Sequence, residues 1–259
     1  MKYFQYFILA AILVQLACGG STVPATSTTV PVTNTPEPTQ TPKPTETSTP
    51  TATPNVTATV AARATESAGT VMTELEDIFG DTDEIPYKNG RLAWQQASPT
   101  TINMSGPQNN TYKPLDKNLT AKNFIFKTDV TWVSGGLIVC GLAFRSEENL
   151  DRGKQYLLYF FRFIGAPVYL IDVFEFGQIK NSITKVQYAS GLDSDNDATN
   201  QFILVAMDEQ FIVYVNGERQ GRYFDTSKQR MDGYFGFMAA QESREGSCKF
   251  EDSWVWALE

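Results

Sequence analysis

Residues 21–59 set the main limit on how this chain can fold. Thr, Pro and Ser dominate this tract and it holds no aromatic residue, so it has little to bury that would offset the entropy lost on folding. We expect a disordered, extended Thr/Pro-rich tether over residues 18–59. Nearly all Phe, Tyr and Trp residues come after Tyr87, which predicts one folded domain over residues 88–259.

The N-terminal residues have the pattern of a secretory signal. A basic start at Lys2 is followed by an apolar run from Phe7 to Leu16, which is too short to cross a bilayer comfortably. We therefore expect residues 1–17 to be a signal peptide that directs export. The rest of the chain would then be extracytoplasmic.

The motif Leu16-Ala17-Cys18-Gly19 resembles a bacterial lipobox. In lipoproteins of this kind the cysteine thiol is acylated, and cleavage makes that cysteine the first mature residue. The resemblance implies a lipid anchor on Cys18 that holds the protein in the cell envelope, at the outer face of a bacterial membrane. Gln15 departs from the aliphatic residue usual at that place, so a plain secretory signal and an uncleaved membrane anchor stay open as alternatives.

The chain has a formal net charge of −8 and no histidine. The negative charge repels phosphate backbones, and no run of Lys or Arg offers an exception, so we expect no nucleic-acid partner. Without histidine the chain lacks the usual general base near neutral pH and the imidazole ligands of most catalytic zinc sites. Ser-His-Asp and Cys-His hydrolases are thereby excluded.

A short connecting helix is expected between the tether and the domain, over residues 60–80. Apolar residues recur on one helical face just before Gly80; they are Met72, Leu75, Ile78 and Phe79. Gly80 ends the pattern. A stripe this short indicates contact with the chain's own domain.

After Lys88 the sequence is a succession of short β-prone runs bounded by turn signals, without a helical period of useful length. The runs cover residues 91–95, 123–133, 137–145, 156–164, 168–176, 182–188, 201–207, 211–215, 220–225, 234–240 and 249–257. So many strands without alternating helices favour antiparallel pairing in two sheets that enclose one core. The predicted fold class is all-β, an antiparallel two-sheet jelly-roll sandwich.

The clearest hairpin ends in Val213-Tyr214-Val215-Asn216-Gly217, where Asn-Gly supplies the positive φ angles of a tight turn. With the later Asp232-Gly233-Tyr234-Phe235-Gly236-Phe237, this pattern resembles the concanavalin A-like lectin/glucanase superfamily, including laminin-G-like domains. Segments 140–145 and 248–256 are similar to tethered bacterial surface domains of that superfamily. The resemblance covers about residues 90–259 and implies the fold, but the superfamily holds lectin-like binders, glycoside hydrolases and adhesive modules.

Cys140 and Cys248 are the cysteines of the expected domain. An exported chain meets an oxidising environment, in which a pair of this kind is usually bridged. We expect a disulfide between them. Two separate buried thiols are the alternative.

The stretch from Leu170 to Glu175 partly resembles the Glu-x-Asp-x-x-Glu strand of family 16 glycoside hydrolases, whose first and last Glu are the nucleophile and the acid/base. Leu170 stands at the nucleophile's position. Only Asp172 and Glu175 remain as candidate catalytic residues, and without the nucleophile double displacement fails. Asp129 is a further carboxylate that such an enzyme could use.

Asp193, Asp195 and Asp197 stand at alternate positions, the spacing from which calcium loops collect oxygen ligands. Ala198 occupies the place where an EF-hand-like loop has glycine, so the loop would have to be a looser type. A Ca2+ site and a solvated acidic turn are both open.

Carbohydrate binding requires aromatic faces beside hydrogen-bonding side chains. The candidate ligand-binding residues are Trp132, Arg145, Tyr159 and Arg162. Aromatic residues of strands more often lie in the core, which is the alternative for each. The expected function is a lipid-anchored surface protein with a lectin-like module for carbohydrate or an envelope protein. A carbohydrate-active hydrolase or lyase and a purely structural or adhesive domain are the alternatives.

Overall fold

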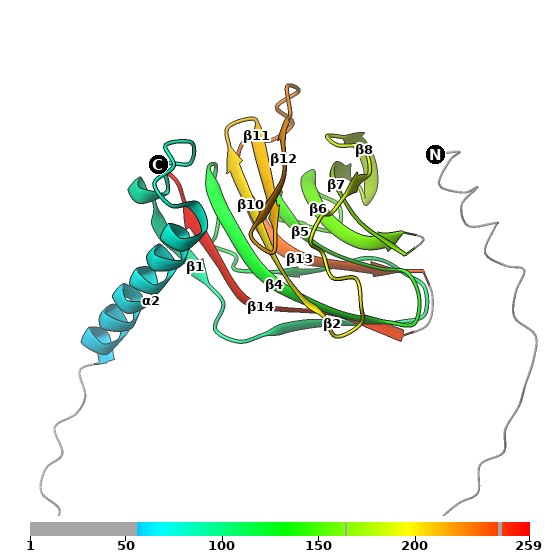
Figure 1. The fold of residues 1–259 in the computed structure, drawn as a ribbon, viewed down its shortest axis with the longest axis horizontal. Helices are drawn as coiled ribbons and strands as arrows, with labels where there is room; N and C mark the ends of the chain where they lie inside the picture. The colour runs from blue at the N-terminus through cyan, green and yellow to red at the C-terminus, as the bar shows by residue number, and fades with distance from the viewer. Residues whose placement is uncertain (1–55, 164, 243–244) are drawn as a thin grey trace, which may run out of the picture. The chain divides into compact units, whose positions relative to one another are not determined.

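Two antiparallel β-sheets lie face to face in this protein (Figure 1). The computed structural model describes residues 56–163, 165–242 and 245–259. Each sheet has seven strands. The prediction of an all-β, antiparallel two-sheet jelly-roll sandwich is confirmed.

The two sheets are called sheet A and sheet B here. The strands of sheet A are, in order, β1 (Arg91–Gln95), β14 (Glu245–Ala257), β4 (Phe124–Ser134), β10 (Thr199–Met207), β11 (Gln210–Val215) and β12 (Glu218–Phe224). The seventh strand, β2 (Thr100–Ser105), also pairs with β14. The strands of sheet B are, in order, β3 (Gln108–Pro114), β13 (Tyr234–Gln241), β5 (Ile138–Ser146), β6 (Gln155–Phe163), β7 (Ala166–Glu175) and β8 (Gln178–Ser182). The seventh strand, β9 (Gln187–Tyr188), also pairs with β7.

Helix α2 (Val56–Phe79) precedes the sheets, and a 3-10 turn, η1 (Tyr87–Asn89), leads into β1. The helix begins four residues before the start that the sequence predicts. Pro54 is the last proline of the tether tract, and nothing beyond it prevents helical hydrogen bonding. Within the described ranges no helix is apolar enough over a sufficient length to span a membrane.

Most predicted β-prone runs are strands, but β2 and β3 were not predicted. The sequence of β3, QNNTYKP, is rich in residues typical of turns, and that of β2, TTINMS, mixes β-prone Thr and Ile with Asn and Ser. The run at residues 182–188 is interrupted: the amides of Ile183 and Thr184 both donate to the Ile171 carbonyl, and the Thr184 hydroxyl accepts the Ile171 amide. β8 and β9 therefore stay separate and short.

The main core lies between the sheets and follows the alternation of each strand. Phe160 of sheet B stacks on Phe202 of sheet A with ring centroids 3.7 Å apart. Cys140 on β5 and Cys248 on β14 are joined by a disulfide, with Cα atoms 5.8 Å apart. This bond ties sheet B to sheet A across the core.

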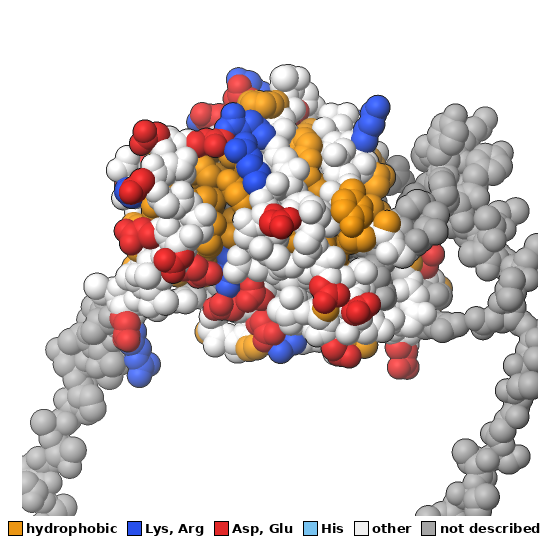
Figure 2. All heavy atoms as spheres, viewed as in Figure 1, with side chains coloured by type: hydrophobic (Ala, Val, Ile, Leu, Met, Phe, Trp, Pro, Cys, Tyr) orange, Lys and Arg blue, Asp and Glu red, His pale blue; other side chains and the backbone are white. Residues whose placement is uncertain are grey.

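A second apolar cluster covers part of the outer face of sheet A. Val71 and Leu75 of α2 are fully buried against strand residues that face away from the main core; these are Ile125, Ile203, Val205, Ile212, Trp254 and Trp256. Figure 2 shows that hydrophobic side chains also reach the surface between α2 and the strands of sheet A. The helix therefore covers a part of sheet A that would otherwise be exposed.

Candidate functional site

The outer face of sheet B carries a row of side chains that crosses the strands. Residues directly opposite each other in antiparallel strands share a face, and the register pairs Tyr112 with Met238, Met238 with Gly141, Gly141 with Tyr159, and Tyr159 with Leu170. In this row Tyr112 and Tyr159 therefore flank Met238 and Gly141.

A neighbouring row ends at a third tyrosine. Phe161 is paired with Val168, and Val168 with Tyr188 of β9. Tyr188 is 68% exposed, whereas Phe161 is half-buried. Tyr112, Tyr159, Phe161 and Tyr188 together are called the aromatic face below. From β3 to β9 it crosses five inter-strand steps, which at about 4.8 Å each give a span of about 24 Å.

Tyr159 lies near the middle of the aromatic face. Its ring stacks on Phe161 at 6.1 Å between centroids and meets Phe174 edge-on at 6.4 Å. A Cβ atom at Gly141 would lie 2.7 Å from the Cβ of Tyr159, so glycine at position 141 makes room for the tyrosine. The hydroxyl of Tyr159 donates to Oδ2 of Asp172.

Asp172 is buried beneath this surface, with 1% of its side chain exposed. Burial raises the pKa of its carboxyl above the ordinary value of 3.8, although the hydroxyls of Tyr159 and Ser182 favour the ionised form. Burial and the Asp172 charge in turn raise the pKa of Tyr159. Tyr159 therefore stays protonated and acts as a hydrogen-bond donor.

A hollow of about 390 Å³ adjoins Tyr112 at one end of the face. Its lining combines Tyr112 and Pro114 of sheet B with residues of the β5–β6 loop, which are Glu148, Asn149, Leu150 and Asp151. Leu150 is buried over Gly236, where a Cβ would lie 2.8 Å from its Cδ1. Burial, with the nearby Asp151 charge, raises the pKa of Tyr112 to about 12. An aromatic ring and hydrogen-bonding side chains thus share one concave site, as carbohydrate recognition requires.

Of the four candidate ligand-binding residues, the structure places Tyr159 on the aromatic face. Trp132 points into the core, fully buried, and donates its indole N–H to the Asp195 carbonyl. Arg145 is also fully buried, because a positive φ of 45° turns it inward, where it donates to the carbonyls of Lys122 and Asp208. Neither Trp132 nor Arg145 offers a surface to a ligand. The side chain of Arg162 lies outside the described residues.

The candidate catalytic residues do not form a facing pair. Asp172 and Glu175 are three positions apart on β7 and therefore point to opposite faces of the strand. Glu175 pairs instead with Lys180, at 3.5 Å between Oε2 and Nζ. The arrangement does not provide the two carboxyls across one scissile bond that glycoside hydrolysis needs.

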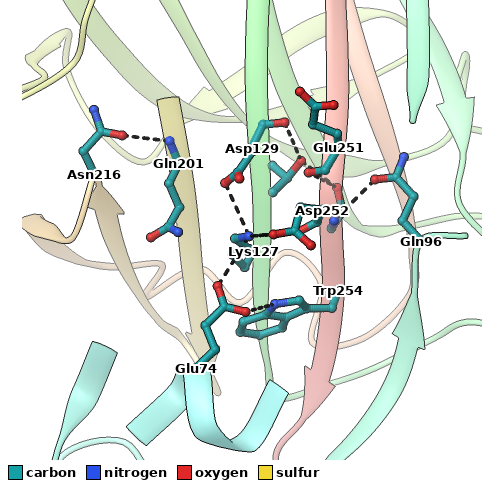
Figure 3. A network of polar contacts seen from close by, with 11 residues as sticks. Glu74, Gln96, Lys127, Asp129, Gln201, Asn216, Glu251, Asp252 and Trp254 are labelled. Carbon is teal, nitrogen blue, oxygen red and sulfur yellow. Dashed lines mark hydrogen bonds and ion pairs between the residues drawn. The ribbon is translucent and has the colours of Figure 1, made fainter. Parts of the chain in front are cut away.

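Asp129 belongs to a network around the buried Lys127 on sheet A (Figure 3). The Lys127 Nζ lies 2.7 Å from Asp252 Oδ2 and 3.4 Å from an oxygen of both Asp129 and Glu74. Glu74 reaches the network from α2 and also accepts the Trp254 indole N–H. Burial raises the pKa of Asp129. The network joins α2, β4 and β14, which gives these carboxylates a structural role.

The candidate calcium ligands do not converge. Oδ1 of Asp193 accepts the amide N–H of Asp195, and all three aspartates of the loop are exposed. Asn196 instead fastens the loop to β4 through two hydrogen bonds with Ser134. Within the described ranges no three His, Cys, Asp or Glu side chains form a group that could hold a metal ion. Of the two readings left open for this loop, the hydrogen bond of the Asp193 carboxylate within the turn favours the solvated acidic turn.

Sequence reasoning missed three members of the aromatic face. Tyr112 lies on β3, which was not predicted, whereas Phe161 and Tyr188 lie in predicted runs but were not singled out. For Tyr188, the sequence signal is its alternation with Val186. Both side chains are exposed in the structure. Cys18 lies outside the described residues.

No protein-family model and no curated protein sequence matches the chain. Several solved structures resemble it in fold. The carbohydrate-binding module CBM66 from Bacillus subtilis has a TM-score of 0.49 and 15% identity over 64% of this chain and 94% of its own. The Bacillus licheniformis beta-glucanase has a TM-score of 0.44 and 9% identity over 66% of this chain and 83% of its own. Sheep galectin-11 has a TM-score of 0.40 and 8% identity over 59% of this chain and 98% of its own.

Likeness at such low identity concerns the fold alone. The fold itself, two antiparallel sheets in a jelly-roll sandwich, is the one that the resemblance to the concanavalin A-like lectin/glucanase superfamily implies.

Proposed function

We propose that this protein is a carbohydrate-binding surface module whose ligand lies across the aromatic face of sheet B. The observation that carries the proposal is the difference between the two sheets. The apolar part of sheet A is covered by α2, whereas sheet B keeps four aromatic rings at or near its surface beside a hollow with hydrogen-bonding side chains. Aromatic rings stack on the apolar faces of sugars, and polar groups at the rim select their hydroxyls.

The charges at the hollow favour some sugars over others. Glu148 and Asp151 are exposed carboxylates, and no Lys or Arg lines the hollow among the described residues. Acidic polysaccharides would meet like charge there, which is destabilising. The preferred ligands are neutral glycans or glycans that carry amino groups.

A binding panel with matched variants tests the proposal. The soluble chain from Gly19 onward is titrated with neutral β-glucan, galactan, fructan and xylan, and with one acidic galacturonan. We expect at least one neutral polysaccharide to bind, and Tyr188→Ala to weaken it roughly two- to twelvefold, because a stacked ring contributes about 0.5–1.5 kcal/mol. Phe224→Ala is the control, since Phe224 is 54% exposed but lies on sheet A. Equal losses from both variants, or no binding at all, would contradict the proposal and favour a structural or protein-binding role.

We also propose that Cys18 carries a lipid and holds the module in the cell envelope, with residues 21–55 acting as a spacer. The lipobox-like motif supports this proposal, and several acyl chains on one residue would anchor firmly. Expression in a bacterial host with a labelled fatty acid tests it. Label in the wild-type chain and none in Cys18→Ser is the expected result, whereas unlabelled wild-type protein released to the medium would contradict it.

A further inference from the structure

Asp172 is a buried carboxyl whose place in sheet B is not explained by core stability. It lies opposite Leu157 on the outer side of the sheet, and both residues are almost fully buried. An apolar residue at this position would gain free energy from burial, whereas a carboxyl loses its hydration. Oδ1 makes no hydrogen bond of ordinary geometry among the described residues. Its clear partner is the Tyr159 hydroxyl, on Oδ2.

The Tyr159 ring is held by contacts on several sides. Gly141 leaves the space that the base of the side chain occupies, Phe161 stacks beside the ring, and Phe174 meets its edge. The hydroxyl end of the ring is held by Asp172. Groups that are fixed before the ligand arrives lose less entropy on binding.

We propose that Asp172 is a positioning residue, whose ionised carboxylate fixes the Tyr159 ring in the orientation that stacks on a bound sugar. This inference rests on the proposed function. A hydrogen bond to an ionised carboxylate is roughly twice as strong as one between neutral groups. Protonation of Asp172 therefore loosens the ring and weakens carbohydrate binding.

Stability changes in the opposite direction. The groups that act on Asp172 are Tyr159 of β6 and Ser182 of β8, and burial outweighs both, so the pKa is raised above 3.8. The folded state then binds more protons than the unfolded state between the ordinary and the raised pKa. Stability consequently rises as the pH falls through this window. Acidification is expected to strengthen the fold and to weaken binding, which a purely structural carboxyl would not do.

The test compares the wild-type chain with Asp172→Asn and Asp129→Asn. Each soluble chain from Gly19 is titrated with the tightest-binding polysaccharide of the panel between about pH 7 and about pH 4, and its unfolding is followed under the same conditions. We expect wild-type affinity to fall about tenfold as Asp172 becomes protonated. Asp172→Asn keeps a neutral acceptor for the Tyr159 hydroxyl, so its affinity should be intermediate and independent of pH. Asp129→Asn should keep the wild-type binding profile, because Asp129 lies on sheet A.

A second measurement needs no ligand. The ring signals of Tyr159 in NMR spectra should titrate with a midpoint above 3.8 in the wild-type chain and should not titrate in Asp172→Asn. Ring signals that do not respond, or identical binding profiles for wild type and Asp172→Asn, would overturn the positioning role alone. Absence of binding by every polysaccharide would overturn the proposed function, and with it the part of this inference that concerns the ligand.

Discussion

The indole N–H of Trp254 on sheet A donates to Glu74 of helix α2, with 2.9 Å between Nε1 and Oε2. The adjacent Leu75 has no exposed surface. These contacts make α2 a part of the folded domain. The helix therefore covers part of the outer face of sheet A and closes that part to a ligand.

Replacing Leu75 by Ala should lower the free energy of unfolding by about 2–5 kcal/mol, because a fully buried leucine is lost and a cavity remains. Chemical denaturation followed by tryptophan fluorescence measures the change. Glu76→Ala is the control, since Glu76 is exposed on the same helix; its effect should stay within about 0.5 kcal/mol. Equal stabilities for Leu75→Ala and wild type would mean that α2 does not dock.

Lys127→Met should cost about 2–3 kcal/mol near neutral pH, because it removes the buried cation that Asp129, Asp252 and Glu74 surround. The exposed position of Asp252 keeps the loss below that of a fully buried pair. As the pH falls and Asp129 becomes protonated, the remaining carboxylates repel each other less, so the loss should shrink. Unfolding curves at several pH values check this, and a loss that grows on acidification would contradict it.

Gly141→Ala should destabilise the domain and weaken carbohydrate binding. Its Cβ would lie 2.6 Å from the Leu158 carbonyl oxygen and 2.7 Å from the Cβ of Tyr159, so the ring has to move. Gly69→Ala is the same substitution in α2, where a Cβ meets nothing within 4 Å. There it should stabilise by about 0.5–1 kcal/mol. Thermal melting and polysaccharide titration of both variants test this difference. Melting temperatures that change in the same direction in Gly141→Ala and Gly69→Ala would contradict the prediction.

Reduction of the Cys140–Cys248 disulfide should lower the free energy of unfolding by about 2–5 kcal/mol, because the bond closes a loop between residues 108 apart in the sequence. Denaturation with and without reductant measures this. The double variant Cys140→Ala/Cys248→Ala should be insensitive to reductant. A wild-type curve that reductant leaves unchanged would show that the bond does not constrain the unfolded chain.

The strands that alternate apolar and polar residues could be predicted from the sequence, since this alternation carries the burial pattern. β3 could not, because its side chains resemble those of a turn and its pairing with β13 comes from distant sequence. Because Tyr112 lies on β3, it could not be predicted as a site residue either. The sequence could therefore predict a two-sheet sandwich but not the whole of its aromatic face.

Which side of a strand faces solvent was the second obstacle. Trp132 and Tyr159 both stand in β-prone runs, but Trp132 points into the core and Tyr159 points outward. Period-two alternation identifies two faces without saying which one is covered, and a bulge such as the one at Arg145 reverses the pattern. The tertiary arrangement of both sheets decides these cases.

Chemical-shift mapping can locate the bound polysaccharide on the two sheets. Amide signals of the chain from Gly19 are recorded with and without the tightest-binding polysaccharide of the panel. We expect shifts on β3, β5, β6, β7 and β9 around Tyr112, Tyr159 and Tyr188, with the signals of sheet A and α2 unchanged. Shifts confined to sheet A or α2, with no change in the signals of the aromatic face, would contradict the proposed binding site.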